Sequence, residues 1–462
     1  MEDIPIETML TASLRLLEGH PLCDGCMGRQ FAWLGTGTSN EERGRSLKLV
    51  LTMTADRLIR TDLKEKGKNI ISILAGNGMF ESAKKLAAKN GVDYKESAYC
   101  HLCTLDGQSV FKRIPEIVQY CVERLARIEY DSFLVGSIPA PVLSEREDEL
   151  RSVHGLLHGE NLKSHFNREL GKHLQEALRK PVEFESPDIV VVFDMTQNLV
   201  RFQVKPLFIY GRYRKLVRGI PQSRWDCTVC GGAGCDECKG TGRRYPDSIS
   251  EYIGIPAREA ARAVDFKFHA AGREDIDVLM LGSGRPFVLE LKRPRIRNID
   301  LESLAREIVS RSEGRIEVSG LSVTRREMGQ ALKRDASVTV KEYFALMRVD
   351  RAVTEEELRA VEKALQGVDI DQRTPTRVAH RRSDLVRRKR VHDISLKPRT
   401  DGLIEVRLRV QGGTYVKELI SGDEQRTQPS IAGLLGAVAE CVELNVVAVH
   451  TETSNTSMGA IP

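Results

Sequence analysis

The chain has 462 residues, too many for a single hydrophobic core, so two or three domains are expected. Apolar residues make up 41% and charged residues 29%, the composition of a soluble globular protein. Aromatic residues are only 5% of the sequence, which argues against binding by many stacked aromatic rings. The net charge of +5 is compatible with nucleic-acid binding but does not demonstrate it.

The N-terminus, MEDIPIETML, is acidic and lacks an apolar signal segment. No run of about 18 apolar residues occurs along the chain. We therefore expect neither a signal peptide nor a membrane span, and we predict a cytoplasmic protein without membrane partners.

From the N-terminus to residue 114 the pattern is mostly helical, with a helix over Glu41–Thr61 and a short strand over Asn69–Leu74. From 115 to 218 the pattern becomes α/β. Two β-branched runs, Asp188–Asp194 and Leu199–Val204, predict a strand, a turn and a strand, and Gly211–Lys215 (GRYRK) supplies a basic edge.

Residues 219–250 are rich in Gly and Cys, as expected of a connector, and from 251 to 462 strand and helix patterns alternate. The alternation over Ile404–Val410 predicts a strand with one wet face. Thr354 followed by Glu357 forms a capping box that opens a helix. The predicted fold class is a multidomain α+β protein.

Eight of the ten cysteines form four CxxC pairs, namely Cys23/Cys26, Cys100/Cys103, Cys227/Cys230 and Cys235/Cys238. Without a secretion signal, such pairs indicate metal ligands or redox motifs before disulfides. Two pairs brought together give the four thiolates of a structural zinc site. For the first two pairs, 73 intervening residues leave open the alternative of two unrelated pairs. The last two pairs lie within twelve residues, and a zinc knuckle or a reduced surface loop both fit them.

The run Gly272–Leu281 (GREDIDVLML) places Arg273 two residues before Asp275 at the end of a predicted strand. On pattern alone, such an Arg–Asp spacing is more often a surface ion pair. However, Gly272-Arg273-x-Asp275-x-x-Val278 resembles the catalytic loop of RNA pseudouridine synthases. The longer run Ala271–Phe287 resembles the archaeal and eukaryotic tRNA pseudouridine(54/55) synthases. The runs Arg373–Arg382 and Gly413–Leu419 support the same family.

The resemblance implies a THUMP-type RNA-binding domain (1–218, with a zinc-binding part over 1–114 and a THUMP-like part over 115–218). It also implies a pseudouridine synthase domain (251–462) with a mixed, mainly antiparallel sheet. It implies that Cys23, Cys26, Cys100 and Cys103 bind one structural zinc, with Cys227, Cys230, Cys235 and Cys238 as a second candidate site. No cofactor is implied for catalysis.

The resemblance also assigns roles. Asp275 would be the nucleophile, and Lys417 would pair with it. Tyr343 would stack on the target base, Arg273 would contact phosphate or sugar, and Leu419 would pack against the base pocket. Without the resemblance, Tyr343 and Lys417 have ordinary structural interpretations. Tyr343 would be a half-buried residue of a strand, and Lys417 would be a solvated cation. Asp277 would structure the loop, and Glu274 would face solvent.

Two basic stretches are predicted to flank the cleft and bind phosphates. Their members are Arg377, Arg381, Arg382, Arg387 and Arg388 in the first stretch, and Lys292 and Arg295 in the second. Two residues depart from the expected family pattern: Leu279 stands where an Arg is expected, and Gln425 stands where a Gly is expected.

The predicted function is therefore guide-RNA-independent isomerisation of uridines 54 and 55 in tRNA by a monomer. One alternative is another THUMP-type tRNA-modifying enzyme, but no nucleotide-binding loop is present, and Gly282-Ser283-Gly284 is too short and precedes no helix. The other alternative is a non-catalytic, zinc-stabilised tRNA-binding protein.

Overall fold

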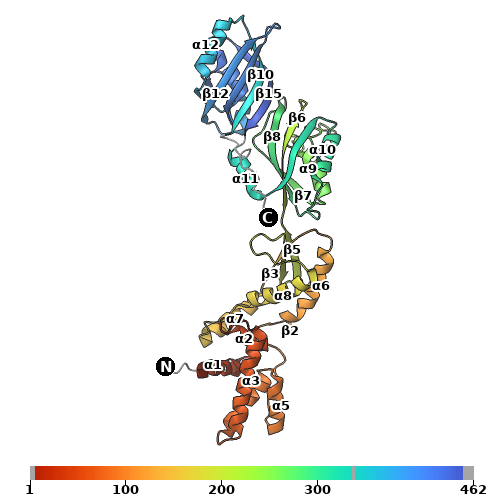
Figure 1. The fold of residues 1–462 in the computed structure, drawn as a ribbon, viewed down its shortest axis with the longest axis vertical. Helices are drawn as coiled ribbons and strands as arrows, with labels where there is room; N and C mark the ends of the chain where they lie inside the picture. Colours follow the sequence, from red (N-terminus) through yellow and green to blue (C-terminus); the bar gives the residue numbers. More distant parts are fainter. Residues whose placement is uncertain (1–5, 336–338, 451–462) are drawn as a thin grey trace. The chain divides into compact units, whose positions relative to one another are not determined.

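The computed structural model describes residues 6–335 and 339–450. The chain divides into two compact units, Met1–Lys205 and Pro206–Pro462 (Figure 1). Each has its own hydrophobic core. Among the described residues, no helix combines the length and the apolar character needed to cross a bilayer.

The first unit begins with five helices: α1 (Ile6–Gly19), α2 (Asp24–Arg29), α3 (Asn40–Ile59), α4 (Lys64–Gly76) and α5 (Glu81–Asn90). Helix α3 confirms the helix predicted over Glu41–Thr61. The strand predicted over Asn69–Leu74 is wrong, because this segment lies in α4. Ile70, Ile71 and Leu74 are buried at helical spacing, so packing against the other helices overrides their β-branched preference.

The rest of the first unit is a small α/β layer. Its strands are β3 (Phe133–Ile138), β4 (Ile189–Asp194) and β5 (Leu199–Val204), in the order β3-β4-β5. Strand β3 runs parallel to β4, and β5 pairs antiparallel with β4, which confirms the predicted strand, turn and strand. Helices α6 (Ile114–Leu125), α7 (Pro141–His154) and α8 (Leu162–Leu178) accompany the strands, and a hairpin of β1 (Thr104–Leu105) and β2 (Gln108–Ser109) with η1 (Val110–Arg113) precedes α6.

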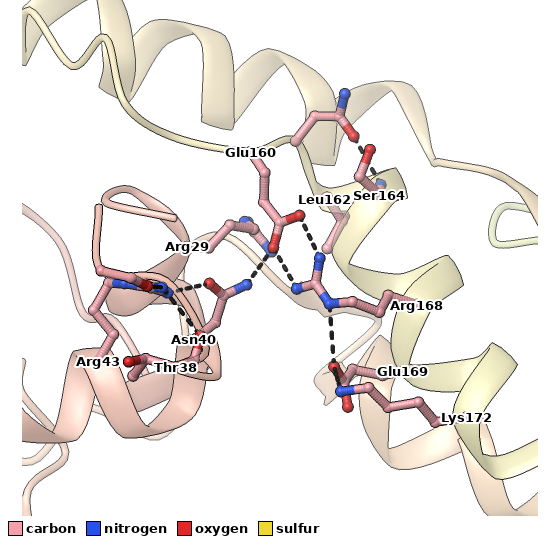
Figure 2. Close-up of polar contacts among 12 residues, drawn as sticks. Arg29, Thr38, Asn40, Arg43, Glu160, Leu162, Ser164, Arg168, Glu169 and Lys172 are labelled. Carbon is pink, nitrogen blue, oxygen red and sulfur yellow. Dashed lines mark hydrogen bonds and ion pairs between the residues drawn. The ribbon is translucent and has the colours of Figure 1, made fainter. Parts of the chain in front are cut away.

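Glu160 joins the helical part of the first unit to α8 (Figure 2). Its carboxylate accepts hydrogen bonds from Asn40 Nδ2 at 2.5 Å and from Arg168 NH1 at 2.6 Å. Asn40 in turn accepts a hydrogen bond from Arg43 NH1 at 2.8 Å. This charge-assisted network links α3 to α8 within the unit.

The second unit is built on a ten-stranded sheet in the order β14-β11-β12-β13-β10-β15-β8-β6-β9, with β7 also paired to β8. The pairing of β15 with β8 is parallel and the other pairings are antiparallel, which confirms the predicted mixed, mainly antiparallel sheet. The strands are β6 (Leu207–Lys215), β7 (Asp265–Ala270), β8 (Leu279–Lys292), β9 (Ile316–Thr324), β10 (Val340–Val349), β11 (Asp369–Arg373), β12 (Val386–Pro398), β13 (Ile404–Gln411), β14 (Thr427–Gln428) and β15 (Ala439–His450).

Helices flank this sheet. They are α9 (Ile249–Ala260), α10 (Leu301–Arg311), α11 (Arg326–Asp335), α12 (Glu355–Leu365), α13 (Val416–Ser421) and α14 (Ile431–Leu435), with the 3-10 turn η2 (Thr376–Arg381). Helix α12 begins with the predicted capping box of Thr354 and Glu357. Strand β13 confirms the alternating pattern over Ile404–Val410.

Strand β6 moves the boundary between the units to Lys205, earlier than the predicted residue 218. It carries the basic run Gly211–Lys215 into the large sheet, where β6 pairs with β8 and β9. The reason is that Leu207, Ile209 and Tyr213 are buried in the second unit's core. The basic edge expected for the first unit is therefore part of the second.

Candidate active site and cysteine clusters

The loop of residues 271–278, between β7 and β8, carries Asp275. Arg377 NH1 lies 2.9 Å from Asp275 Oδ2. Lys417 Nζ lies 3.9 Å from the same oxygen. Both cations come from elements much later in the sequence: Arg377 belongs to η2 and Lys417 to α13. The Asp275 side chain is 36% exposed, so it is accessible while held between two positive charges.

The cation predicted beside Asp275 from local spacing lies elsewhere. The Arg273 guanidinium lies over the Trp225 ring, 5.2 Å from its centroid. Lys417 was predicted to pair with Asp275, but its Nζ lies closer to Asp277 Oδ2, at 2.7 Å. The cation therefore contacts both carboxylates. Burial acts to raise the pKa of Asp277, but the hydrogen bond from Lys417 and the positive charges of Lys417 and Arg377 together lower that pKa.

Arg377 is oriented by a second carboxylate. Its Nε donates to Glu418 Oε1 at 2.5 Å, and the Glu418 side chain is only 5% exposed. Burial of Arg377 acts against its charge, but the hydrogen bond to Glu418 raises its pKa, so the cation beside Asp275 stays charged. The sequence placed Arg377 among the RNA contacts and gave no sign of this pairing, because η2 and α13 meet only in the fold.

The expectation that Glu274 faces solvent is wrong. Glu274 is buried and pairs with Arg285 Nε of β8 at 2.8 Å. It also accepts a hydrogen bond from the Tyr213 hydroxyl at 2.8 Å, and Gln222 Nε2 donates to that hydroxyl at 2.9 Å. This buried network fixes the residue next to Asp275.

The loop backbone is held from β6 as well. Lys215 Nζ donates to the carbonyl oxygen of Ile276 at 2.8 Å and to that of Asp275 at 3.3 Å. Burial lowers the pKa of Lys215 to about 8. Arg285 NH1 adds a 2.7 Å hydrogen bond to Ala271 O. Sequence reasoning missed Lys215, Tyr213 and Arg285, since nothing in their local pattern distinguishes them from other strand residues.

The Asp275 loop lines a cavity of about 650 Å³ in the second unit. Tyr343 and Lys341 of β10 line it too. Burial raises the pKa of the Tyr343 phenol, so the hydroxyl stays protonated. Burial, with Arg285 nearby, lowers the pKa of Lys341 to about 7. Other lining residues are Trp225, Arg244, Tyr245, Arg273, Arg285, Arg377, Arg382, Tyr415, Val416 and Lys417.

Leu419 does not have the position predicted for it. Its side chain is fully buried in the core beneath α13, and it is not among the described residues that line the cavity. The neighbouring apolar residue Val416 lines the cavity instead. Val416 is the first residue of α13 and reaches the cavity, whereas Leu419, about one turn later, packs into the core.

The basic stretches separate into cavity and non-cavity residues. Arg382 lines the cavity and its NH1 donates to the Tyr415 hydroxyl at 2.9 Å. Arg387 and Arg388 lie on β12, outside the described lining, and Arg388 Nε pairs with Asp369 at 3.2 Å. The Arg381 side chain lies outside the described residues.

Lys292 and Arg295 do not flank the cavity as predicted. Lys292 ends β8 and pairs with Asp265 at the opposite end of β7 from the Asp275 loop. Seven residues of strand separate it from Arg285, or about 23 Å at the rise of a β-strand. Closeness in sequence misled the prediction, because β8 is long.

The first cysteine cluster brings together Cys23, Cys26, Cys100 and Cys103, whose sulfurs all lie within 4.8 Å of one another. The two pairs therefore meet across the 73-residue separation. Cys23 Sγ and Cys103 Sγ are 3.9 Å apart. A tetrahedral zinc with Zn–S bonds of about 2.3 Å separates its sulfurs by about 3.8 Å. The arrangement fits such an ion.

In the second cluster, the sulfurs of Cys227, Cys230, Cys235 and Cys238 also lie within 4.8 Å of one another. Three sulfur separations are 3.7–3.9 Å. Backbone amides donate to the sulfurs, from Gly234 to Cys230 at 3.2 Å and from Gly242 to Cys238 at 3.1 Å. Gly242 has a φ of +65°, and a Cβ there would lie 2.3 Å from Gly232 O. We call residues 227–242 the knuckle.

Comparison with known sequences places both units. The sequence model described as "Pus10, C-terminal" matches residues 208–450. The model described as "Pus10 THUMP domain, archaeal" matches residues 117–194. The chain belongs to the Pus10 family. Pseudouridine synthases are isomerases, so membership confirms the predicted family and enzyme class, and the THUMP-type domain is confirmed as well.

Three curated Pus10 relatives, each named tRNA pseudouridine synthase Pus10, align over nearly the whole chain. The Methanothrix thermoacetophila protein is 42% identical and covers 96% of this chain and 94% of its own length. The Methanocaldococcus jannaschii protein is 41% identical and covers 94% and 93%. The Methanopyrus kandleri protein is 40% identical and covers 92% and 94%.

Two residues depart from the pattern expected of Pus10. Leu279 begins β8 and pairs with Asn445 of β15, so it takes part in the sheet. Gln425 has a φ of +67°, in the left-handed region that glycine adopts most easily. The Gly expected there fits this backbone, and neither departure replaces a residue that contacts Asp275.

Proposed function

We propose that this chain converts uridine to pseudouridine at positions 54 and 55 of tRNA, with Asp275 as the nucleophile and without a guide RNA. One observation carries the proposal. The Asp275 carboxylate lies on the wall of a 650 Å³ cavity between Arg377 at 2.9 Å and Lys417 at 3.9 Å, and Tyr343 lines the same cavity. Membership of the Pus10 family supports it.

The chemistry needs a carboxylate, a base-holding side chain and no external reactant. The C1′–N1 bond of the everted uridine breaks as Asp275 attacks the sugar or base or stabilises the sugar cation. The freed uracil turns, a C1′–C5 bond forms, and the C5 proton is lost as N1 gains one. Tyr343 would stack on the base while it turns. Its protonated phenol also offers a hydrogen-bond donor.

Cations around the cavity would bind the RNA backbone. Arg377, Arg382 and Arg273 line it and would hold phosphates next to the everted nucleotide. Arg387, Arg388, Lys292 and Arg295 would contact RNA outside the cavity. The THUMP-type domain gives the chain its own RNA-binding part, which supports action on tRNA without a guide.

Both cysteine clusters would hold structural zinc. Each supplies four thiolates and no open coordination position, so the ion would stabilise the fold and would not activate water. Cys23, Cys26, Cys100 and Cys103 would fix the start of the first unit. Cys227, Cys230, Cys235 and Cys238 would fix the knuckle. We expect the protein to act as a cytoplasmic monomer.

Paired carboxylate variants test the nucleophile. Asp275→Asn should abolish pseudouridine formation on an unmodified tRNA transcript, mapped chemically at single-nucleotide resolution, while tRNA binding changes little. The matched variant Asp277→Asn, two residues away and also beside Lys417, should retain most activity. Normal modification by Asp275→Asn would refute its role. Wild-type protein that binds tRNA tightly but isomerises no uridine would favour the non-catalytic tRNA-binding alternative.

A further inference from the structure

The residues that flank the knuckle on either side, Trp225, Arg244 and Tyr245, form one wall of the cavity that holds Asp275. We call these flanking residues the base of the knuckle. Two backbone hydrogen bonds join its ends, from Cys227 N to Gly242 O at 2.9 Å and from Arg244 N to Trp225 O at 3.0 Å. They bracket an isolated bridge between Asp226 and Arg243. As a result, Trp225 before the knuckle and Arg244 after it lie next to each other, although they are far apart in sequence.

Two aromatic rings stand together at this base. The centroids of the Trp225 and Tyr245 rings are 5.7 Å apart, with an angle of 78° between their planes. The Arg244 guanidinium lies 5.5 Å from the Trp225 ring and 5.8 Å from the Tyr245 ring. Arg273 covers Trp225 at 5.2 Å. We call Trp225, Arg244, Tyr245 and Arg273 the aromatic wall.

The aromatic wall faces the same cavity as Asp275. All four of its residues line that cavity together with Asp275 and Tyr343. Both rings are only half-buried, and both guanidinium groups are exposed. In a chain with two tryptophans and 5% aromatic residues, a cluster of two half-buried rings and two arginines beside Asp275 needs an explanation.

Their chemistry matches an unpaired nucleotide. Aromatic faces and guanidinium planes stack on splayed bases, and arginines also bind the adjoining phosphates. Everting a uridine leaves its neighbour without a stacking partner on one side. A surface that supplies such a partner within the same cavity would stabilise the opened RNA.

We propose that Trp225 and Tyr245 form a stacking subsite for the nucleotide next to the everted uridine, held in place by the metal-bound knuckle. This inference rests on the proposed function, since it takes the everted uridine to lie at Asp275. It assigns the second cysteine cluster a part in substrate binding rather than in overall stability alone.

The dependence on metal follows from how little else orders the knuckle. Its residues are mostly exposed, and Val229 is 71% exposed, so apolar burial contributes little. The Gly242 amide that donates to Cys238 Sγ lies shortly before the part of the base that carries Tyr245. Loss of the metal would free this base and with it the aromatic wall.

Tryptophan fluorescence provides a readout that does not depend on activity. Trp33→Phe leaves Trp225 as the single tryptophan, and Asp275→Asn in the same protein prevents turnover. Titration with unmodified tRNA should quench Trp225 emission with the same midpoint as binding measured by filter retention. Tight binding with unchanged emission would overturn the proposed subsite. Failure of the proposed function appears separately, as absence of pseudouridine in the wild-type assay.

Substitutions test the energetic weight of the stacking. In the Asp275→Asn protein, Trp225→Ala should weaken tRNA binding by about 10-fold, the effect of removing one stacked base. In the active protein the same change should raise KM more than it lowers kcat. Trp225→Phe should restore most of the loss, because it keeps an aromatic face. A control substitution away from the knuckle, Val323→Ser on β9, where the side chain is 58% exposed, should leave KM unchanged.

Ligand substitutions test the role of the metal. The double change Cys235→Ser and Cys238→Ser should lower the zinc content from two ions per chain to one and remove the tRNA-dependent quench of Trp225. A cooperative melt by circular dichroism checks that the sheet remains folded. Metal loss with full quenching would refute the part assigned to the knuckle, and retention of two zincs would refute the ligand set.

Discussion

Three carboxylates lie within four residues of the chain, and their environments in the fold differ. Glu274 is buried against Arg285, Asp275 lies between Arg377 and Lys417 at the cavity wall, and Asp277 is exposed and bonded to Lys417. Only Asp275 combines access to the cavity with two cations. Environment therefore distinguishes Asp275 as the candidate nucleophile, as expected when neighbouring charges and burial decide protonation.

At the residue scale, Arg377 should matter more to the reaction than Lys417. Its NH1 is 1.0 Å closer to Asp275 than Lys417 Nζ, at 2.9 against 3.9 Å, and it is fixed by the buried Glu418. Arg377→Met should lower the single-turnover rate about 100-fold. The matched Lys417→Met should lower it less. A larger loss for Lys417→Met would show that the longer contact is the one that counts.

The sequence could nominate a candidate carboxylate, Asp275, because the motif that carries it is contiguous. It could not predict which cations lie beside that carboxylate. The cation predicted from spacing was Arg273, which lies over Trp225 instead, and the closest one, Arg377, comes from another element. Burial of Glu274 depends on the register between β6 and β8, which local patterns do not encode.

Lys341 should make stability depend on pH. Its folded-state pKa of about 7 lies below the usual 10.5, so between these values the unfolded chain binds more protons and stability rises with pH. Lys341→Met removes this rise. The variant should be more stable than wild type near pH 6.5, and the gap should shrink by about 1.4 kcal/mol per pH unit above pH 7.

Urea unfolding at several pH values measures this gap. The exposed Lys397→Met on β12 is the control, and its gap from wild type should stay constant. Lys215, whose pKa is lowered to about 8, contributes a rise of the same sign in both proteins and cancels in the comparison. A constant gap for Lys341→Met would contradict a depressed lysine.

At the scale of elements, the sequence predicted where several strands lie, but it did not predict what packs around each segment. The alternating run of β13 and the pair β4 and β5 are visible in the sequence because one face is buried and the other wet. The segment Asn69–Leu74 has the same β-branched character but lies in α4, where surrounding helices bury it. Propensity fails where tertiary packing supplies most of the energy.

The buried pair of Arg285 and Glu274 should hold β8 to the Asp275 loop. Both side chains are 1% exposed, so removing one leaves the other charged and unpaired in the core. Arg285→Met should lower the free energy of unfolding by about 3–5 kcal/mol. The double variant with Glu274→Gln should recover a large share of it, because the remaining amide is neutral.

A double-mutant cycle by chemical denaturation checks this pair. The exposed pair of Arg399 and Asp401 is the matched control, with side chains 40% and 45% exposed, and Arg399→Met should cost under about 1 kcal/mol. If Arg285→Met costs no more than Arg399→Met, the buried network does not stabilise the loop.

At the scale of the whole molecule, length predicted more than one domain, and the change in composition after residue 218 set the predicted boundary. In the structure the chain divides after Lys205. The Gly- and Cys-rich stretch after residue 218 has the composition of a connector, yet it carries the knuckle and lies inside the second unit. The division at Lys205 follows from β6, whose pairing with β8 and β9 is not visible in its own sequence.

This boundary can be tested with two fragments. Residues 206–462 should fold alone and melt cooperatively, because all ten strands of the large sheet are present. Residues 219–462, cut at the predicted boundary, should not. Without β6, β9 loses its only neighbour in the described sheet, and the loop around Asp275 loses Tyr213 and Lys215. Circular dichroism melts and amide NMR dispersion measure the difference. A fragment starting at residue 200 should behave like 206–462, and a cooperative melt of 219–462 at the same temperature would show that β6 is dispensable.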